Sequence, residues 1–157
     1  MHGADAPAWA HWLEASALGA FARAGGWGYA AANTLHVLGV AALFGALLAY
    51  DLRVLGVARA AIPVQSAAAL LLPLARGGFA LAALSGLVLL AADASHVAVN
   101  PAFRAKAALL GLALLNVAAL HALGGRDLRP GVLRAAAALS LALWVGVIAC
   151  GRLIAYL

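Results

Sequence analysis

A run of 23 residues without a charged side chain, from Gly28 to Tyr50, constrains the fold of this chain more than any other feature. About 20 apolar residues in a helix cross the hydrocarbon core of a bilayer, so the run is long enough to span a membrane. Three further apolar stretches follow it. We expect the four spans at about residues 28–50, 74–97, 104–123 and 134–156. The sequence therefore predicts an all-α fold, an integral membrane four-helix bundle, in a single transmembrane domain.

The composition supports a membrane environment. Of the 157 residues, 67% are hydrophobic and only 10% are charged. Soluble proteins carry about 25% charged residues, because their surfaces face water. A surface this poor in charge is stable only where lipid is the solvent, so we expect the lipid bilayer to surround most of the chain.

The basic residues argue against a nucleic-acid partner and indicate an orientation. The net charge is +5, but the ten basic residues are scattered, without a basic run or interleaved aromatic side chains. One side of the membrane is expected to hold Arg53, Arg59, Arg76, Arg126, Arg129 and Arg134, and the other Arg23, Arg104, Lys106 and Arg152. By the positive-inside rule, this excess predicts a bacterial inner (cytoplasmic) membrane protein with both termini outside the cytoplasm.

The N-terminal segment is expected to lie on the membrane surface. Residues 7–22 have the pattern of a short amphipathic helix that turns Trp9, Leu13 and Phe21 toward the lipid. The pair Gly25-Gly26 then ends this helix before the first span. No cleavable signal peptide is expected, because charged residues interrupt any long apolar core in this segment.

Small residues predict close packing in two of the spans. They recur at four-residue spacing at Gly78, Ala82 and Gly86 in the second span, and at Gly146 and Cys150 in the fourth. Such faces let helix backbones approach closely in a membrane. The general abundance of alanine is the alternative explanation. Before the second span, residues 60–73 leave two possibilities open: Pro63 could open a helix, and Pro73 could produce a kink that separates an interfacial turn from the span.

Two polar residues are expected to have structural roles. Asn116, in the middle of the third span, is a candidate for a hydrogen bond to a neighbouring helix. Asp51 lies where the first helix leaves the membrane, and we expect it to pair with Arg76 or with an arginine of the third loop. Such a pair would be a structural latch at the inner border.

His36 is the strongest candidate for a functional residue. It lies about eight residues into its span, roughly 10–12 Å below the outer border. An ionisable side chain there costs roughly 2–3 kcal/mol, so we expect it to have a partner. Neutral imidazole is a good iron ligand, and Gly39, one turn later, could leave room for a flat group such as haem. A hydrogen bond to a neighbouring helix and a proton relay are the alternatives.

Other residues could complete a haem site. His96 and His121 are candidate second axial ligands, although His121 lies at the opposite border and could serve a second site. Arg152 and Lys106 could neutralise haem propionates or extend to the lipid headgroups. The predicted cofactor is haem b, with His36 as the metal ligand and His96, His121, Arg152 and Lys106 as further cofactor-binding candidates.

Several other chemistries lack the residues they need. Copper transport favours soft ligands, but Met1 and Cys150 are the only methionine and cysteine. Zinc hydrolysis needs a cluster of histidines or carboxylates, and the span interiors offer little besides His36. No Ser-His-Asp set and no nucleotide-binding glycine loop is present. We predict no catalytic residue, and whether the protein is an enzyme stays open.

Four strings carry a family resemblance: His36-Val-Leu-Gly39, Asp51-Leu-Arg-Val-Leu-Gly56, Asn100-Pro-Ala-Phe-Arg-Ala-Lys106 and Gly151-Arg-Leu-Ile-Ala-Tyr156. Over residues 27–157 the chain resembles an uncharacterised family of small four-span bacterial membrane proteins. Three features follow one another along the chain: His36 early in the first span, the pair Ser85-Gly86 in the second, and Lys106 at the start of the third. This order is similar to that in the copper-resistance protein D-like domain. It is also similar to the HemJ-type protoporphyrinogen oxidases, which are small haem-binding bundles. This similarity implies that His36 is a haem ligand and that Lys106 corresponds to the lysine at the start of the third span in those families. It implies no second axial histidine and no oxidase activity.

We therefore expect a b-type haem-binding membrane protein for electron transfer, with a quinone or a redox protein as its partner and the haem near the outer face. The alternative is a non-catalytic membrane subunit or assembly partner in which His36 makes a structural hydrogen bond. Its small-residue faces would then bind a partner or a second copy of the chain. A carrier is a third hypothesis, for which four spans are few unless the protein is a homo-oligomer.

Overall fold

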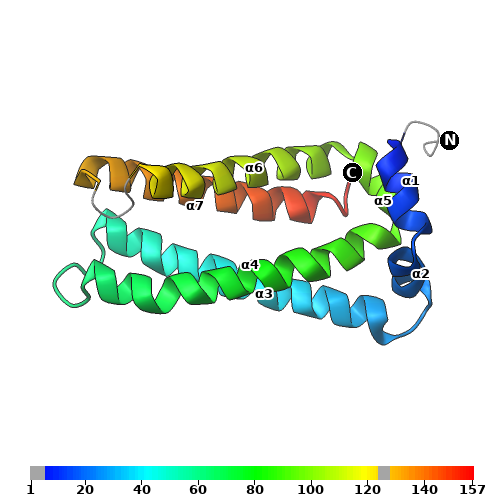
Figure 1. The fold of residues 1–157 in the computed structure, drawn as a ribbon, viewed down its shortest axis with the longest axis horizontal. Helices are drawn as coiled ribbons and strands as arrows, with labels where there is room; N and C mark the ends of the chain where they lie inside the picture. The colour runs from blue at the N-terminus through cyan, green and yellow to red at the C-terminus, as the bar shows by residue number, and fades with distance from the viewer. Residues whose placement is uncertain (1–5, 124–127) are drawn as a thin grey trace.

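The computed structural model describes residues 6–123 and 128–157, and within these ranges the chain forms seven helices and no strand (Figure 1). They are α1 (Ala8–Ala15), α2 (Ala17–Arg23), α3 (Trp27–Leu55), α4 (Val64–Ala92), α5 (Ala94–Val99), α6 (Pro101–Ala122) and α7 (Pro130–Leu153). The predicted all-α fold is confirmed.

Four of these helices are long and apolar enough to cross a membrane. α3 and α4 have 29 residues each, α6 has 22 and α7 has 24. Even α6 extends about 33 Å at 1.5 Å per residue, slightly more than the hydrocarbon core of a bilayer. The chain is a multi-pass membrane protein.

The second long helix starts earlier than the sequence indicated. α4 begins at Val64, directly after Pro63, and continues through Pro73. A membrane helix tolerates an internal proline, because neighbouring groups can satisfy the backbone carbonyl that the proline leaves free. At its other end α4 stops at Ala92, so His96 belongs to the separate short helix α5.

The four long helices form two hairpins. α3 packs along α4 and α6 packs along α7, and the hairpins meet chiefly where α3 contacts α7 (Figure 1). The buried core between them consists of Leu43, Ala46, Ala75, Ala113, Leu143, Trp144 and Val147. Within the second hairpin, the Asn116 amide of α6 donates to the Ala136 carbonyl of α7 at 3.1 Å, which confirms the predicted interhelical hydrogen bond.

Glycines bring α3 and α4 into direct backbone contact. A Cβ atom on Gly39 would lie 2.6 Å from the backbone nitrogen of Ala82, and one on Gly78 would lie 2.5 Å from that of Leu43. Real Cβ atoms do not approach other atoms so closely. The prediction that the small residues of the second span form a helix-packing face is confirmed.

The N-terminal segment forms two short helices instead of the single one expected over residues 7–22. Ser16 separates them: its hydroxyl donates to the Leu13 carbonyl at 2.6 Å and accepts from the Gly19 N–H at 3.3 Å. The second contact is an N-cap, which favours a new helix start. The lipid-facing position predicted for Leu13 is wrong, since Leu13 packs against a small cluster of Ala10, Ala94 and Ala98. Trp9 and Phe21 are exposed, so the prediction that they face lipid stays a prediction.

Polar contacts tie these short helices to the end of the bundle. Arg23 donates to the carbonyls of Ala91 and Ala92, the last residues of α4, at 3.4 and 3.3 Å. A carboxylate oxygen of Glu14 accepts from the Ser95 N–H in the first turn of α5 at 2.9 Å. Hydrogen bonds from Ser95 hold the pKa of Glu14 below its usual value. Each charge complements the dipole of the helix end that it contacts.

Candidate functional site

The imidazole of His36 faces α4, not lipid. Its Nδ1 lies 2.8 Å from the backbone carbonyl oxygen of Ala82 and 3.5 Å from the hydroxyl oxygen of Ser85. A carbonyl oxygen can only accept, so Nδ1 carries the proton in this contact and Nε2 keeps its lone pair. The hydrogen bond therefore fixes both the direction of the ring and its tautomer.

Gly86 provides the space in which the imidazole lies. A Cβ atom on Gly86 would be 3.0 Å from Cε1 and 3.2 Å from Nδ1 of His36. With Ala82 one turn earlier, Gly86 forms a shallow seat on α4 for one edge of the ring. The Ser85 hydroxyl also hydrogen-bonds to carbonyls of its own helix, those of Leu81 and Ala82.

The sequence predicted that Gly39 leaves room for a ligand. This prediction is wrong. The open side of Gly39 is filled by the backbone of α4 at Gly78 and Ala82. The physical reason is that two helices lined with small residues pack backbone to backbone in a membrane. Any group that binds His36 therefore has to approach from a side of the ring other than this contact.

Lys106 is the candidate residue whose charge reaches His36. It lies in the first turns of α6 and is half-buried, and its charge acts electrostatically on the imidazole. Its Nζ atom lies against α7, 3.3 Å from the place that a Cβ atom of Gly151 would occupy. Within the described ranges, Lys106 makes no hydrogen bond or ion pair, and Nε2 of His36 accepts no hydrogen bond. The imidazole nitrogen of His36 on α3 and the amine of Lys106, between α6 and α7, are thus both unpaired and lie in the same half of the bundle.

The other predicted cofactor residues have partners of their own. His96 lies on α5 with Nδ1 3.5 Å from a carboxylate oxygen of Asp93, and both side chains are 61% exposed. His121 ends α6 at the far border and donates from Nδ1 to the Val117 carbonyl at 2.8 Å.

Arg152, near the end of α7, donates to the Tyr156 hydroxyl at 3.2 Å and lies over its ring at 5.5 Å. Of the five residues, only His36 and Lys106 interact with each other in the described structure, and they do so through charge and not through direct contact. His96 and Arg152 lie at the same end of the bundle without joining them, and His121 lies at the other end.

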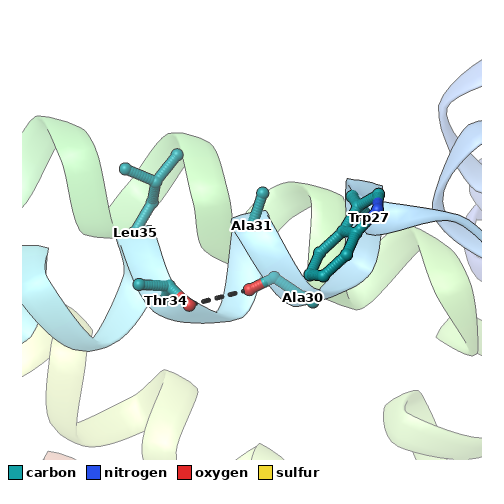
Figure 2. A pocket seen from close by; sticks show the side chains of 5 residues that line it. All are labelled: Trp27, Ala30, Ala31, Thr34 and Leu35. Atoms are coloured by element: carbon teal, nitrogen blue, oxygen red, sulfur yellow. Dashed lines mark hydrogen bonds between the residues drawn. The ribbon is translucent and has the colours of Figure 1, made fainter.

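The hollows on the surface of α3 do not include His36. Figure 2 shows one that is lined by Trp27, Ala30, Ala31, Thr34 and Leu35, with the Thr34 hydroxyl donating to the Ala30 carbonyl at 2.9 Å. A second is lined by Asn33, Thr34, Val37 and Leu38. All of these residues belong to one helix, so lipid chains can fill both hollows and no opposing element encloses a ligand.

Sequence reasoning missed a second polar site, at the opposite end of α3. Asp51 is buried, and the nearest polar side chain that acts on its carboxyl group is the Ser140 hydroxyl of α7. The predicted partner Arg76 instead donates to the Leu72 carbonyl of its own helix, so that pairing is wrong. Ser140 lies on the buried stripe of α7 with Ala137, Trp144 and Val147. This stripe is the signal that could have identified Ser140 as the partner. Of the third-loop arginines, Arg126 lies outside the described residues.

The described residues contain no group of three or more His, Cys, Asp or Glu side chains that could hold a metal ion. A metal ion held by side chains alone is therefore not supported at either site. A macrocycle that supplies most of the ligands to its own iron requires only one or two protein ligands.

Comparison with known proteins gives a family without a function. Residues 9–157 match a family described as "Family of unknown function (DUF6644)". No curated protein and no solved structure matches the chain. The expectation of an uncharacterised family is confirmed, whereas neither the copper-resistance protein D-like domain nor the HemJ-type oxidases are among the matches.

Proposed function

Because the chain belongs to this family of unknown function, we propose its function from its own geometry: it is a membrane protein that binds haem b through Nε2 of His36. The observation that carries this proposal is the hydrogen bond from Nδ1 of His36 to the Ala82 carbonyl. Histidines that ligate metals usually donate their other ring N–H to a carbonyl or a carboxylate, which orients the ring. The ring of His36 is already oriented in this way, and its Nε2 has no partner within the described ranges.

We propose that two side chains would hold the haem. Nε2 of His36 would supply the axial ligand, and the Lys106 amine could pair with a propionate carboxylate. Lys106 is half-buried among apolar helices without a counter-charge in the described part of the chain, so an anionic group there would be favourable. Among the described residues no second histidine lies beside His36, so we assign one axial ligand to the protein.

A bound haem would supply one-electron chemistry, and the chain's own residues would hold and orient it. Proposed partners are a quinone or a redox protein, and a second copy of the chain. The excess of basic residues at the α3–α4 and α6–α7 turns supports a bacterial inner membrane location with both termini outside the cytoplasm.

A specific observation favours a second candidate function. The ring of His36 touches α4 at both Ala82 and Gly86, so its hydrogen bond also ties the two helices of the first hairpin together. In this alternative His36 is structural, and the protein is a non-catalytic membrane subunit or assembly partner.

An optical spectrum of the protein purified from haem-sufficient cells distinguishes the two candidates. Haem binding predicts a Soret band that shifts on reduction with dithionite, is absent in His36→Ala and is retained in His121→Ala. His121 is a matched control, because its Nδ1 also donates to a backbone carbonyl but at the far border.

The structural alternative predicts a colourless and folded wild-type protein. In that case His36→Gln, which keeps a side-chain donor for the Ala82 carbonyl, should unfold at a higher temperature than His36→Ala. A colourless wild type with this order of stabilities contradicts haem binding and supports the structural function.

A further inference from the structure

Two buried polar atoms have no hydrogen-bond partner within residues 6–123 and 128–157, and both lie at the contact between α3 and α7. They are Oδ2 of Asp51 and Nε1 of Trp144. Both side chains are only 5% exposed. The buried hydroxyl of Ser140, one turn before Trp144 on the same face of α7, acts on the Asp51 carboxyl group. Orphaned buried polar atoms are rare in folded proteins and call for an explanation.

No cation neutralises Asp51 in the described part of the chain. The single ion pair found there does not include Asp51. Arg53 of α3 and Arg76 of α4 both donate to backbone oxygens instead. The basic residues at this end of the described structure are Arg53, Arg59, Arg76, His121, Arg129 and Arg134. None of these six is among the groups that act on the Asp51 carboxyl group.

A buried carboxylate without a counter-charge is strongly unfavourable in an apolar bundle. A metal ion would require several oxygen ligands, whereas Asp51 and Ser140 offer one carboxyl group and one hydroxyl, and Trp144, one turn further along α7, adds an indole N–H. The indole N–H is a donor only and disfavours a cation. A proton needs no further ligand and removes the charge.

We propose that Asp51 is a proton-binding site of the bundle, formed with Ser140 and Trp144, whose occupancy controls the contact between the two helical hairpins. Proton uptake forms an O–H bond at Oδ2, and release returns the proton to water and leaves the negative charge on the carboxylate. The site lies near the border of the spans, four residues before α3 ends at Leu55, so water is close.

The place of the site gives proton binding a structural consequence. α3 and α7 form the main contact between the hairpins, and Trp144 belongs to the core that joins them. A charge that appears on Asp51 weakens this contact, because water has to enter the interface to solvate it. Deprotonation should therefore open the α3–α7 contact and leave each hairpin intact.

Infrared spectroscopy in lipid nanodiscs tests the proposal between pH 4.5 and 9. We expect a carbonyl band of a protonated, buried carboxyl group that disappears as the pH rises and is absent in Asp51→Asn. Asp93→Asn is the matched control, because Asp93 is exposed at the other end of the bundle, and should keep the band. Asp51→Glu should move the band without abolishing it, which keeps the assignment testable if Asp51→Asn does not fold.

Tryptophan fluorescence provides the structural readout. Trp144 is buried, whereas Trp9, Trp12 and Trp27 are exposed, so a variant with these three replaced by Phe reports on the site alone. The fluorescence emission of this variant should change with the same pH midpoint as the infrared band. The midpoint should stay the same when His121→Gln is added, because the titrating group is Asp51. A band that Asp51→Asn leaves unchanged, or an emission that does not follow the band, overturns the proposal.

Discussion

Polar side chains between the spans hydrogen-bond to backbone carbonyls of a neighbouring helix. His36 donates to Ala82 of α4, and Asn116 donates to Ala136 of α7. A helical carbonyl has a second lone pair after it has accepted its own helical bond, so such contacts disrupt neither helix. In a region without water, each contact fixes one pair of helices relative to each other.

The contact of Asn116 can be tested by Asn116→Leu, which keeps a similar volume and removes one interhelical hydrogen bond. We expect a loss of about 0.6 kcal/mol in the free energy of unfolding, the average for such bonds in membrane proteins. Unfolding in mixed detergent micelles measures it. Asn33→Leu, at an exposed position of α3 without a hydrogen bond in the described ranges, should have no such effect. Equal effects of the two substitutions would contradict the contact.

Glu14 predicts a pH dependence outside the spans. Its pKa is lowered by the hydrogen bonds from Ser95, so the carboxylate stabilises the docking of α1 on α5 above the ordinary pKa of about 4.5. This contribution is lost as the pH falls through the lower pKa of the folded state. It should not exceed about 1 kcal/mol, because the contact faces solvent.

Hydrogen exchange of residues 8–23 at pH 3.5 and 7 measures this effect. Exchange should be faster at the lower pH after correction for the intrinsic rates, and in Glu14→Ala the corrected rates at the two pH values should be the same. Protection that depends on pH equally in Glu14→Ala would disprove the assignment.

At the scale of elements, backbone contact between α3 and α4 defines the first hairpin. Gly39 and Gly78 face the opposite backbone, whereas Gly45 and Gly77 have open space where a Cβ atom would lie. The same substitution at neighbouring glycines therefore has opposite consequences, because only two of them lie in the helix crossing.

Gly39→Ala and Gly78→Ala should each destabilise the protein by about 1–3 kcal/mol, since the helices have to move apart. Gly45→Ala and Gly77→Ala are the matched controls on the same two helices and should be neutral or slightly stabilising. Thermal unfolding in detergent measures all four. A similar loss in the controls would show that helix flexibility, not close approach, requires the glycines.

The sequence was sufficient to predict the elements whose length the bilayer determines. All four long helices lie where uncharged runs predicted spans, because a membrane permits few alternatives for such runs. The start of α4 was misplaced because Pro63 begins a helix that then continues through Pro73. The division of the N-terminal helix was missed because one hydroxyl, that of Ser16, decides it locally.

The candidate site could be predicted only in part. His36 was identified because it is an imidazole in an apolar run. The direction in which its ring points depends on how α3 crosses α4, and hydropathy does not predict that crossing. The proximity of Lys106 depends on the packing of α6 against α7 for the same reason. The pairing of Asp51 with Arg76 was wrong because charge pairing predicted an arginine, whereas Arg76 donates to its own helix and the buried carboxyl group of Asp51 lies near the neutral hydroxyl of Ser140.

At the scale of the whole molecule, two hairpins share a limited contact and a short helical cap closes one end. The cap of α1, α2 and α5 lies at the end that contains His36, His96 and Lys106 (Figure 1). The exposed Trp9, Trp12 and Trp27 lie on or next to this cap, as is typical of aromatic side chains at headgroup level. The proposed orientation puts this end on the outer side of the membrane.

Cysteine labelling tests the orientation of the whole chain. In a Cys150→Ala background, Ala8→Cys should react with a membrane-impermeant maleimide in intact spheroplasts, because α1 would lie outside. Ala60→Cys, in the exposed turn between α3 and α4, should react only after the membrane is opened. The reverse pattern would put both termini in the cytoplasm.

The central claim, that Nε2 of His36 binds haem iron, is tested most directly by adding haem to the haem-free protein in nanodiscs and measuring the Soret band. We predict saturation at one haem per chain for the wild type, no saturable binding for His36→Gly, and recovery of binding by His36→Gly when free imidazole occupies the place of the missing ring. Identical titrations of the wild type and His36→Gly, or no saturable binding by the folded wild type, would contradict the claim.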